Sequence, residues 1–302
     1  MTQEKEINIP VVRELVQLSK KIRFPGGKGF TLYHFLDVYI TGIIKGTFSF
    51  RASSIAYSFF LALFPFLLSL LNLIPYIPIK NFQDRFLQFF EALMPPQTAD
   101  FFYPVIEDIA LNPRAGLLSF VFVLSVFLSA NGVNAIFSAF EYSFHVTINR
   151  SFFKQYFVAV LVSVFLTFLL LTTVGVILYG EYLIADLQSM DYINNNVLWV
   201  SVLRAIVVII MIYIIIATLY YFGTKESKLS KFFSIGAVVT TLLFLLTTYF
   251  FGVYINNFSK YNELYGSIGA LLILMLYIWI NANLLLLGFE LNLSLQRLKE
   301  KM

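Results

Sequence analysis

The stretch that decides the fold is residues 51–75, which read RASSIAYSFFLALFPFLLSLLNLIP. No charged residue occurs between Ala52 and Ile74. A helix of about 20 apolar residues is long enough to cross the ~30 Å hydrocarbon core of a bilayer. The stretch therefore predicts a membrane-spanning helix.

Small residues within this span predict a close helix contact. Ser54, Ser58 and Ala62 recur every four positions and so share one helical face. A face of small residues lets a second helix approach closely, which matters in lipid because no hydrophobic drive favours packing there. Pro65 has no backbone N–H, so the carbonyl of Leu61 loses its usual partner and we expect the helix to bend.

Composition indicates a membrane protein throughout. Of the 302 residues, 59% are hydrophobic and 13% are charged, about half the charged share of a soluble domain. The chain has no cysteine, so neither a disulfide nor a thiolate metal site is expected. Its first long apolar run begins about fifty residues in, so a cleaved signal peptide is not expected. We predict an all-α fold, a polytopic transmembrane helical bundle.

Five further apolar stretches bring the predicted number of spans to six. They run over residues 116–140, 152–184, 197–222, 232–255 and 268–295. The stretch 152–184 would reach ~50 Å as an unbroken helix, so it should tilt or project beyond the bilayer. The predicted organisation is an N-terminal cytoplasmic segment (1–50), a membrane domain (51–296) and a short cytoplasmic tail (297–302).

Two segments outside the spans carry amphipathic patterns. Over residues 32–44, apolar side chains recur on one helical face while His34 and Asp37 lie on the other. This pattern predicts a helix lying on the cytoplasmic membrane surface, with a helix docked on the spans as the alternative. Residues 76–115 predict two short outer helices that form a lid or a docking surface.

Positive charges predict the orientation. Sixteen Lys and Arg residues lie in segments on the side of the two termini, and four lie on the opposite side. Loops rich in Lys and Arg stay cytoplasmic, so both termini are predicted to be cytoplasmic. Arg204 falls inside the fourth span near its outer end. It has three options: to snorkel outward, to contact an anionic substrate group, or to pair with Glu181, Asp186 or Glu263.

Polar side chains line one face of the second span and one side of the sixth. They are Asn131, Asn134, Ser138 and Glu141 in the second span, and Asn281, Asn283 and Glu290 in the sixth. Polar groups in hydrocarbon are costly unless they face the bundle interior or water, so the stripes predict a polar pathway or interhelical hydrogen bonds. Arg51, Glu141 and Glu290 fall near the cytoplasmic ends of their spans, which predicts a structural clamp or an inner gate.

Several motifs resemble those of the YihY/BrkB family of bacterial inner-membrane proteins. They are the opening Arg51-Ala52 with Phe64-Pro65, the run from Ala130 to Ile136, and Gly288-Phe289-Glu290, where the family commonly has Gly-Ala-Glu. The resemblance covers roughly residues 30–295 and implies a location in the bacterial inner membrane. Family members have been labelled ribonuclease BN or a serum-resistance virulence factor, and some relatives have been connected with envelope lipid export.

The residues argue against the nuclease. The two histidines, His34 and His145, are far apart in sequence, and no His/Asp metal motif or general-base pair accompanies them. We therefore expect no enzyme activity, catalytic residue, metal, cofactor or nucleic-acid partner.

Two functions remain open for such a bundle. The first is a permease or flippase-like carrier of an amphipathic or lipid-related substrate, without an ATP site because no GxxxxGK[ST] pattern occurs. The second is a membrane scaffold that binds envelope-assembly or lipid-transfer proteins on residues 82–109. A water-accessible tunnel between the second and sixth spans would favour the carrier. A solid core with an apolar patch on residues 82–109 would favour the scaffold.

The topology predicts where two engineered thiols are accessible. Since the chain has no cysteine, Gln188→Cys and Lys228→Cys each introduce a single thiol, the first outside and the second in the cytoplasm. An impermeant maleimide added to intact cells should label position 188, and should label position 228 only after the membrane is opened. Labelling of both positions from one side would overturn the six-span topology.

Overall fold

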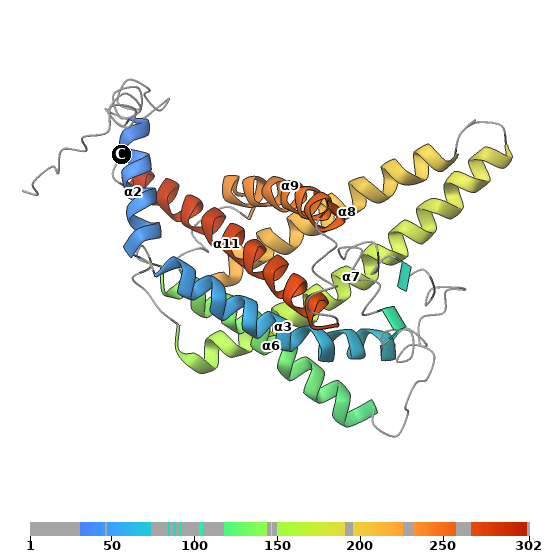
Figure 1. Cartoon of the computed structure of the whole chain (residues 1–302), viewed down its shortest axis with the longest axis horizontal. Coiled ribbons are helices and arrows are strands. Elements are labelled where there is room, and N and C mark those ends of the chain that lie inside the picture. The colour runs from blue at the N-terminus through green and yellow to red at the C-terminus, as the bar shows by residue number, and fades with distance from the viewer. Residues whose placement is uncertain are drawn as a thin grey trace, which may run out of the picture.

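The computed structural model describes residues 31–45, 47–73, 118–143, 150–190, 196–225, 232–257 and 267–300, and single positions at 84, 87, 88, 91, 103, 104 and 146. Its helices are α2 (Leu32–Lys45), α3 (Phe48–Leu73), α6 (Leu118–Glu141), α7 (Phe152–Ser189), α8 (Asn196–Gly223), α9 (Ile235–Asn257) and α11 (Ser267–Glu300). Figure 1 shows how they are arranged. The predicted all-α helical bundle is confirmed.

Each predicted span corresponds to one helix with boundaries shifted by a few residues. The largest differences are at the ends of α7 and α11, which reach Ser189 and Glu300 and so pass their predicted ends by five residues each. No glycine or proline interrupts either extension. Five helices, α6, α7, α8, α9 and α11, are long and apolar enough to cross a membrane. The side chains of α3 are described only as far as Leu63, so the count of six spans stays a prediction. Residues 1–30 lie outside the described residues, and so do the two predicted outer helices except for the helical positions 84, 87, 88, 91, 103 and 104.

Helix α2 takes the place of the predicted amphipathic helix and packs against α11. The Tyr39 hydroxyl donates to the carbonyl of Leu287, 3.2 Å away. Figure 1 shows α2 beside the C-terminal part of α11. Ile40 and Ile44 remain exposed on α2, so the helix docks on a span and still presents apolar side chains outward.

The spans form a closed cycle of contacts. Helix α3 packs along α6, α6 along α7, α7 along α8, α8 along α9, and α9 along α11, which returns to α3. The first and last spans are therefore neighbours, and the bundle is complete only when α11 is in place.

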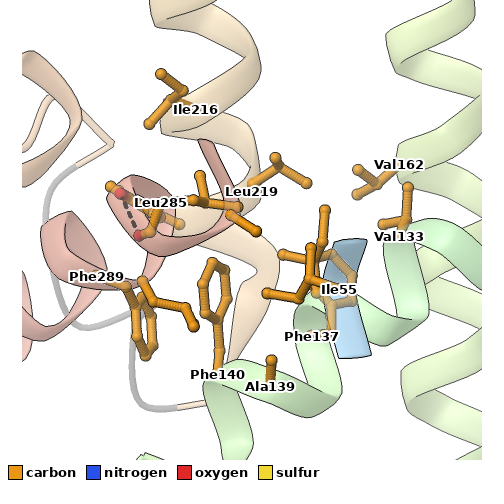
Figure 2. Close-up of a cluster of buried hydrophobic side chains, with 14 of the residues drawn as sticks. Ile55, Val133, Phe137, Ala139, Phe140, Val162, Ile216, Leu219, Leu285 and Phe289 are labelled. Atoms are coloured by element: carbon orange, nitrogen blue, oxygen red, sulfur yellow. Dashed lines mark hydrogen bonds between the residues drawn. The ribbon is translucent and has the colours of Figure 1, made fainter. Parts of the chain in front are cut away.

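The main hydrophobic core occupies one half of this bundle, which we call the inner half. It combines the N-terminal parts of α3 and α7 with the C-terminal parts of α6, α8 and α11. Those are the ends that the charge distribution assigns to the cytoplasm. Figure 2 shows Phe140 of α6 facing Phe289 of α11, and their rings stack with centroids 4.0 Å apart. Tyr220 of α8 completes this aromatic group. Its ring lies in a T-shaped arrangement with that of Phe140, with the ring centroids 5.8 Å apart.

The opposite half of the bundle is more open among the described residues. Helices α7 and α8 extend together as a hairpin away from the other helices (Figure 1). Its first arm, α7, has 38 residues and so a length of ~57 Å. Between Leu198 and Ile210 no described side chain of α8 is buried. A smaller cluster of Phe251, Ile255 and Ile273 joins α9 to α11 in this half.

Two glycines set the closest helix approach in the inner half. A Cβ at Gly288 of α11 would collide with the hydroxyl of Thr240 and would lie 2.5 Å from the Tyr220 hydroxyl oxygen. A Cβ at Gly236 of α9 would collide with the backbone carbonyl of Gly288. Because one obstacle is backbone, the crossing cannot accept a methyl group without moving a helix.

We therefore expect Gly288→Ala to destabilise the bundle by at least ~1–3 kcal/mol, the usual cost of overpacking. Gly175→Ala is the matched control, since a Cβ there meets nothing within 4 Å. It should be neutral or stabilising by up to ~1 kcal/mol because alanine favours the helix. Thermal unfolding in detergent measures both, and equal melting temperatures would contradict the close crossing.

Candidate functional site

A buried ion pair lies at the centre of the inner half. Arg51, in the first turn of α3, donates through a terminal nitrogen to Glu290 Oε1 of α11, 2.9 Å away. The two side chains are 2% and 0% exposed. Arg51 Nε also donates to the carbonyl of Ala139 at 2.6 Å, and the Ser143 hydroxyl donates to Glu290 Oε2 at 2.9 Å. The pair thus joins α3, α6 and α11.

The electrostatics explain why the hydrogen bonds are necessary. Removing two charges from water costs several kcal/mol per ion, and mutual attraction offsets this only when the remaining polar atoms are satisfied. Both carboxylate oxygens of Glu290 accept a hydrogen bond, one from each neighbour. On the adjoining α2, burial and, second, the charge of Glu290 raise the pKa of Tyr39, so its hydroxyl stays a neutral donor.

A second polar cluster surrounds Glu141 at the C-terminus of α6. Glu141 Oε1 accepts the backbone N–H of Arg150 at 3.0 Å. Gln155, in the first turn of α7, lies between Glu141 and the pair Asn134 and Ser138. When its amide nitrogen faces Glu141, that nitrogen is 2.8 Å from Oε2 and 3.2 Å from Oε1. The amide oxygen is then 2.8 Å from Ser138 Oγ.

Polar contacts also cap two helix ends on this side. The Arg150 guanidinium donates to the carbonyls of Phe222 and Thr224, at 2.5 and 2.7 Å, where α8 ends. Asn292 of α11 accepts the backbone N–H of Gly236 at 2.8 Å and donates to Ser234 Oγ at 2.9 Å, where α9 begins. Unsatisfied backbone groups at helix ends need such partners. The inner ends of the helices are therefore fixed to one another by hydrogen bonds.

The two predicted polar stripes do not meet in this structure. Asn134, Ser138 and Glu141 of α6 contact Gln155 of α7, while Asn131 is exposed. In the α11 stripe, Glu290 pairs with Arg51, and the two asparagines bond to carbonyls of their own helix. Phe140 and Phe289 stack where α6 faces α11. A polar pathway between these helices stays a prediction.

The amides of the α11 stripe bond mainly within their own helix. Asn281 donates to the carbonyl of Tyr277 at 2.9 Å, and Asn283 donates to that of Trp279 at 2.7 Å. The side-chain oxygen of Asn281 is buried and has no hydrogen-bond partner in the described part of the chain.

Arg204 adopts one of its three predicted options in this structure. Its Nε and a terminal nitrogen lie 2.7 and 2.6 Å from Glu181 Oε1, which joins α8 to α7. The Arg204 side chain is 51% exposed, so this ion pair is far less buried than the pair of Arg51 and Glu290.

The small residues of α3 lie partly against α6. A Cβ at Gly132 would be 3.0 Å from the Cβ of Ala62 and 3.8 Å from the carbonyl of Ser58, whereas Ser54 is exposed. Helix α3 is continuous through the position of Pro65 and ends at Leu73.

Three residues of these clusters were not predicted from the sequence: Gln155, Arg150 and Ser143. Gln155 had a usable signal, because a lone amide in the first turn of an otherwise apolar helix needs a polar partner. Ser143 and Arg150 lie in the segment between α6 and α7, where polar residues are expected whether or not they bind anything. Among the described residues, no three His, Asp or Glu side chains are grouped to hold a metal ion.

Comparisons with known proteins relate the sequence of this chain to a family of membrane proteins. A family model described as "Virulence factor BrkB" matches residues 40–301. The "Putative ribonuclease-like protein YfkH" of Bacillus subtilis (strain 168) is 28% identical over 253 residues, which cover 83% of this chain and 90% of that protein. A UPF0761 membrane protein of Psychrobacter sp. (strain PRwf-1) is 25% identical over 276 residues, which cover 88% of this chain but 49% of that protein. No solved structure matches the chain.

The buried ion pair predicts an asymmetric response to mutation. Arg51→Leu should cost ~3–5 kcal/mol of stability, because it leaves the Glu290 carboxylate buried without its cation. The double variant Arg51→Leu/Glu290→Leu should recover most of that loss, since no buried charge remains.

Arg204→Leu is the control at the exposed pair and should cost about 1 kcal/mol or less. Unfolding in detergent would measure all three variants. A double variant as unstable as Arg51→Leu, or an Arg204→Leu loss of the same size, would contradict this account.

Proposed function

The chain belongs to the BrkB family of membrane proteins, and on that basis we propose that it is a permease or flippase-like carrier of an amphipathic or lipid-related substrate. The observation that carries the proposal is the uneven packing of the bundle. A filled core and cross-helix hydrogen bonds occupy the inner half, while the α7–α8 hairpin diverges from the other helices in the outer half. A carrier must close one end of its bundle at a time, and such packing suits a state closed at the inner end.

The surfaces of the outer half support a substrate with an apolar part. Several exposed side chains of α8 in this half are large and apolar, among them Leu198, Trp199 and Val202. A lipid chain is compatible with such a surface, whereas a fully hydrophilic solute is not. The location we propose is the bacterial inner membrane, with both termini in the cytoplasm.

Unsatisfied polar atoms support a wet interior for part of a cycle. Thr218 Oγ1 of α8 and Asn281 Oδ1 of α11 are buried, and neither has a hydrogen-bond partner in the described part of the chain. A buried polar atom without a partner costs ~1–3 kcal/mol, and water or a substrate group would satisfy it.

One observation favours the alternative, a membrane scaffold that does not transport. The stacked rings of Phe140 and Phe289 fill the contact between α6 and α11, where the sequence predicted a pathway. The partner surface of that scaffold, residues 82–109, falls mostly outside the described residues. The two functions therefore differ in whether the inner core opens.

Transport by the purified protein tests the proposal directly. Proteoliposomes that contain the protein should move a headgroup-labelled phospholipid between leaflets faster than protein-free vesicles, as measured by quenching with an impermeant reductant. Leu286→Cys reports the opening, because Leu286 is fully buried in the inner core of a cysteine-free chain. A maleimide should label it slowly, while Tyr142→Cys, at an exposed position, should react at once.

Lipid movement at the protein-free rate, together with complete protection of the thiol at position 286, would exclude the carrier and leave the scaffold. Gly288→Ala, which we expect to destabilise the bundle, controls for vesicle leakage caused by misfolded protein.

A further inference from the structure

The two carboxylates of the inner half have different partners. Glu290 is paired with a buried guanidinium at 2.9 Å and so has a dedicated counter-ion. Glu141 accepts a backbone N–H and faces a neutral amide, and no described Lys or Arg side chain forms an ion pair with it. The nearest cation, Arg150, directs its guanidinium to the carbonyls at the end of α8. Glu141 is thus a half-buried acid without a dedicated counter-ion.

The Gln155 amide fits the cluster in two opposite orientations. In one orientation the amide nitrogen donates to Asn134 Oδ1 at 3.0 Å and to Ser138 Oγ at 2.8 Å, and its oxygen faces the Glu141 carboxyl group. In the other, the nitrogen donates to Glu141 and the oxygen accepts from Ser138 Oγ. The heavy-atom positions are the same in both.

These orientations correspond to the two protonation states of Glu141. A carboxylate only accepts hydrogen bonds, so it requires the amide nitrogen. A protonated carboxyl group carries an O–H donor, so it requires the amide oxygen. In the first orientation each contact of the Gln155 amide pairs a donor with an acceptor once Glu141 is protonated. In the second, the Asn134 amide must rotate as well, so that its nitrogen and not its oxygen lies 3.0 Å from Gln155 Oε1.

We propose that Glu141 is a reversible proton-binding site, and that the Gln155 amide rotates by half a turn each time Glu141 binds or releases a proton. The proton enters the carboxylate to form a carboxyl group, whose O–H then donates to Gln155 Oε1. After the rotation the amide nitrogen donates to Asn134 and Ser138. A charge change on α6 therefore alters the hydrogen bonds of α7. This site goes beyond the proposed function and does not require it, since proton binding is measurable without transport.

The other charged groups on the described elements around Glu141 are cations, or belong to the buried ion pair. They are Arg150 before α7, the exposed Lys154 and Lys225 on α7 and after α8, and the mutually compensating Arg51 and Glu290 on α3 and α11.

Infrared difference spectroscopy of the detergent-purified protein tests the proposal. Lowering the pH from about 9 to about 4 should produce a protonated-carboxyl band with a matching loss of carboxylate, and Glu141→Gln should remove that component. Glu181→Gln, at the other end of α7, should retain it. An unchanged carboxyl band in Glu141→Gln would overturn the site.

Gln155→Leu keeps the acid and so guards against a folding defect in Glu141→Gln. The substitution removes the amide N–H that donates to the carboxylate, and this charge-assisted hydrogen bond is stronger than the one made by the protonated acid. The midpoint of the Glu141 band should therefore move upward by about one pH unit. Lys154→Arg on the same turn keeps the positive charge and should leave the midpoint unchanged. A midpoint unaltered by Gln155→Leu would overturn the part assigned to the amide.

Discussion

A charge buried inside a membrane bundle must find its partner within the same chain, and the rest of this structure depends on that constraint at Arg51. Its guanidinium lies in the first turn of α3 and pairs with Glu290 on α11 at 2.9 Å. This requirement brings the first and last spans together and closes the cycle of helices. Phe289, which precedes Glu290 in the sequence, stacks on Phe140 of α6.

The polar contacts are distributed unevenly along the bundle. At the inner end, side chains of α3, α7 and α11 reach across to neighbouring helices and bond their backbone or their acids. At the other end, the described part offers the half-exposed pair of Arg204 and Glu181 and the contact between the hydroxyls of Thr248 and Tyr277, both more exposed than the inner ion pair. Hydrogen bonds hold helix ends in fixed positions, whereas apolar contacts between helices in lipid permit sliding. Motion of this molecule should therefore be greatest where α7 and α8 extend from the bundle.

Hydropathy was sufficient to predict the helices, because a bilayer requires long apolar stretches whatever their tertiary neighbours are. It was less informative about the site. The periodicity of Asn134, Ser138 and Glu141 placed them on one face of α6, but periodicity does not specify which helix that face meets. The face meets Gln155 of α7 and not α11. Likewise the spacing of Ser54, Ser58 and Ala62 identified a small face, while only the crossing angle of two helices decides that Gly132 lies beside the last two.

The order of synthesis gives the ion pair a further consequence. Arg51 and Glu290 are 239 residues apart, and at ~5–20 residues per second a ribosome needs about 10 to 50 s to make that interval. During this time α3 must enter the membrane with its arginine unmatched, and a cation near a span end can wait there only by reaching toward the headgroups. Closure of the bundle through this ion pair therefore waits until α11 has been made, and a chain interrupted before α11 lacks the carboxylate that Arg51 meets in the structure.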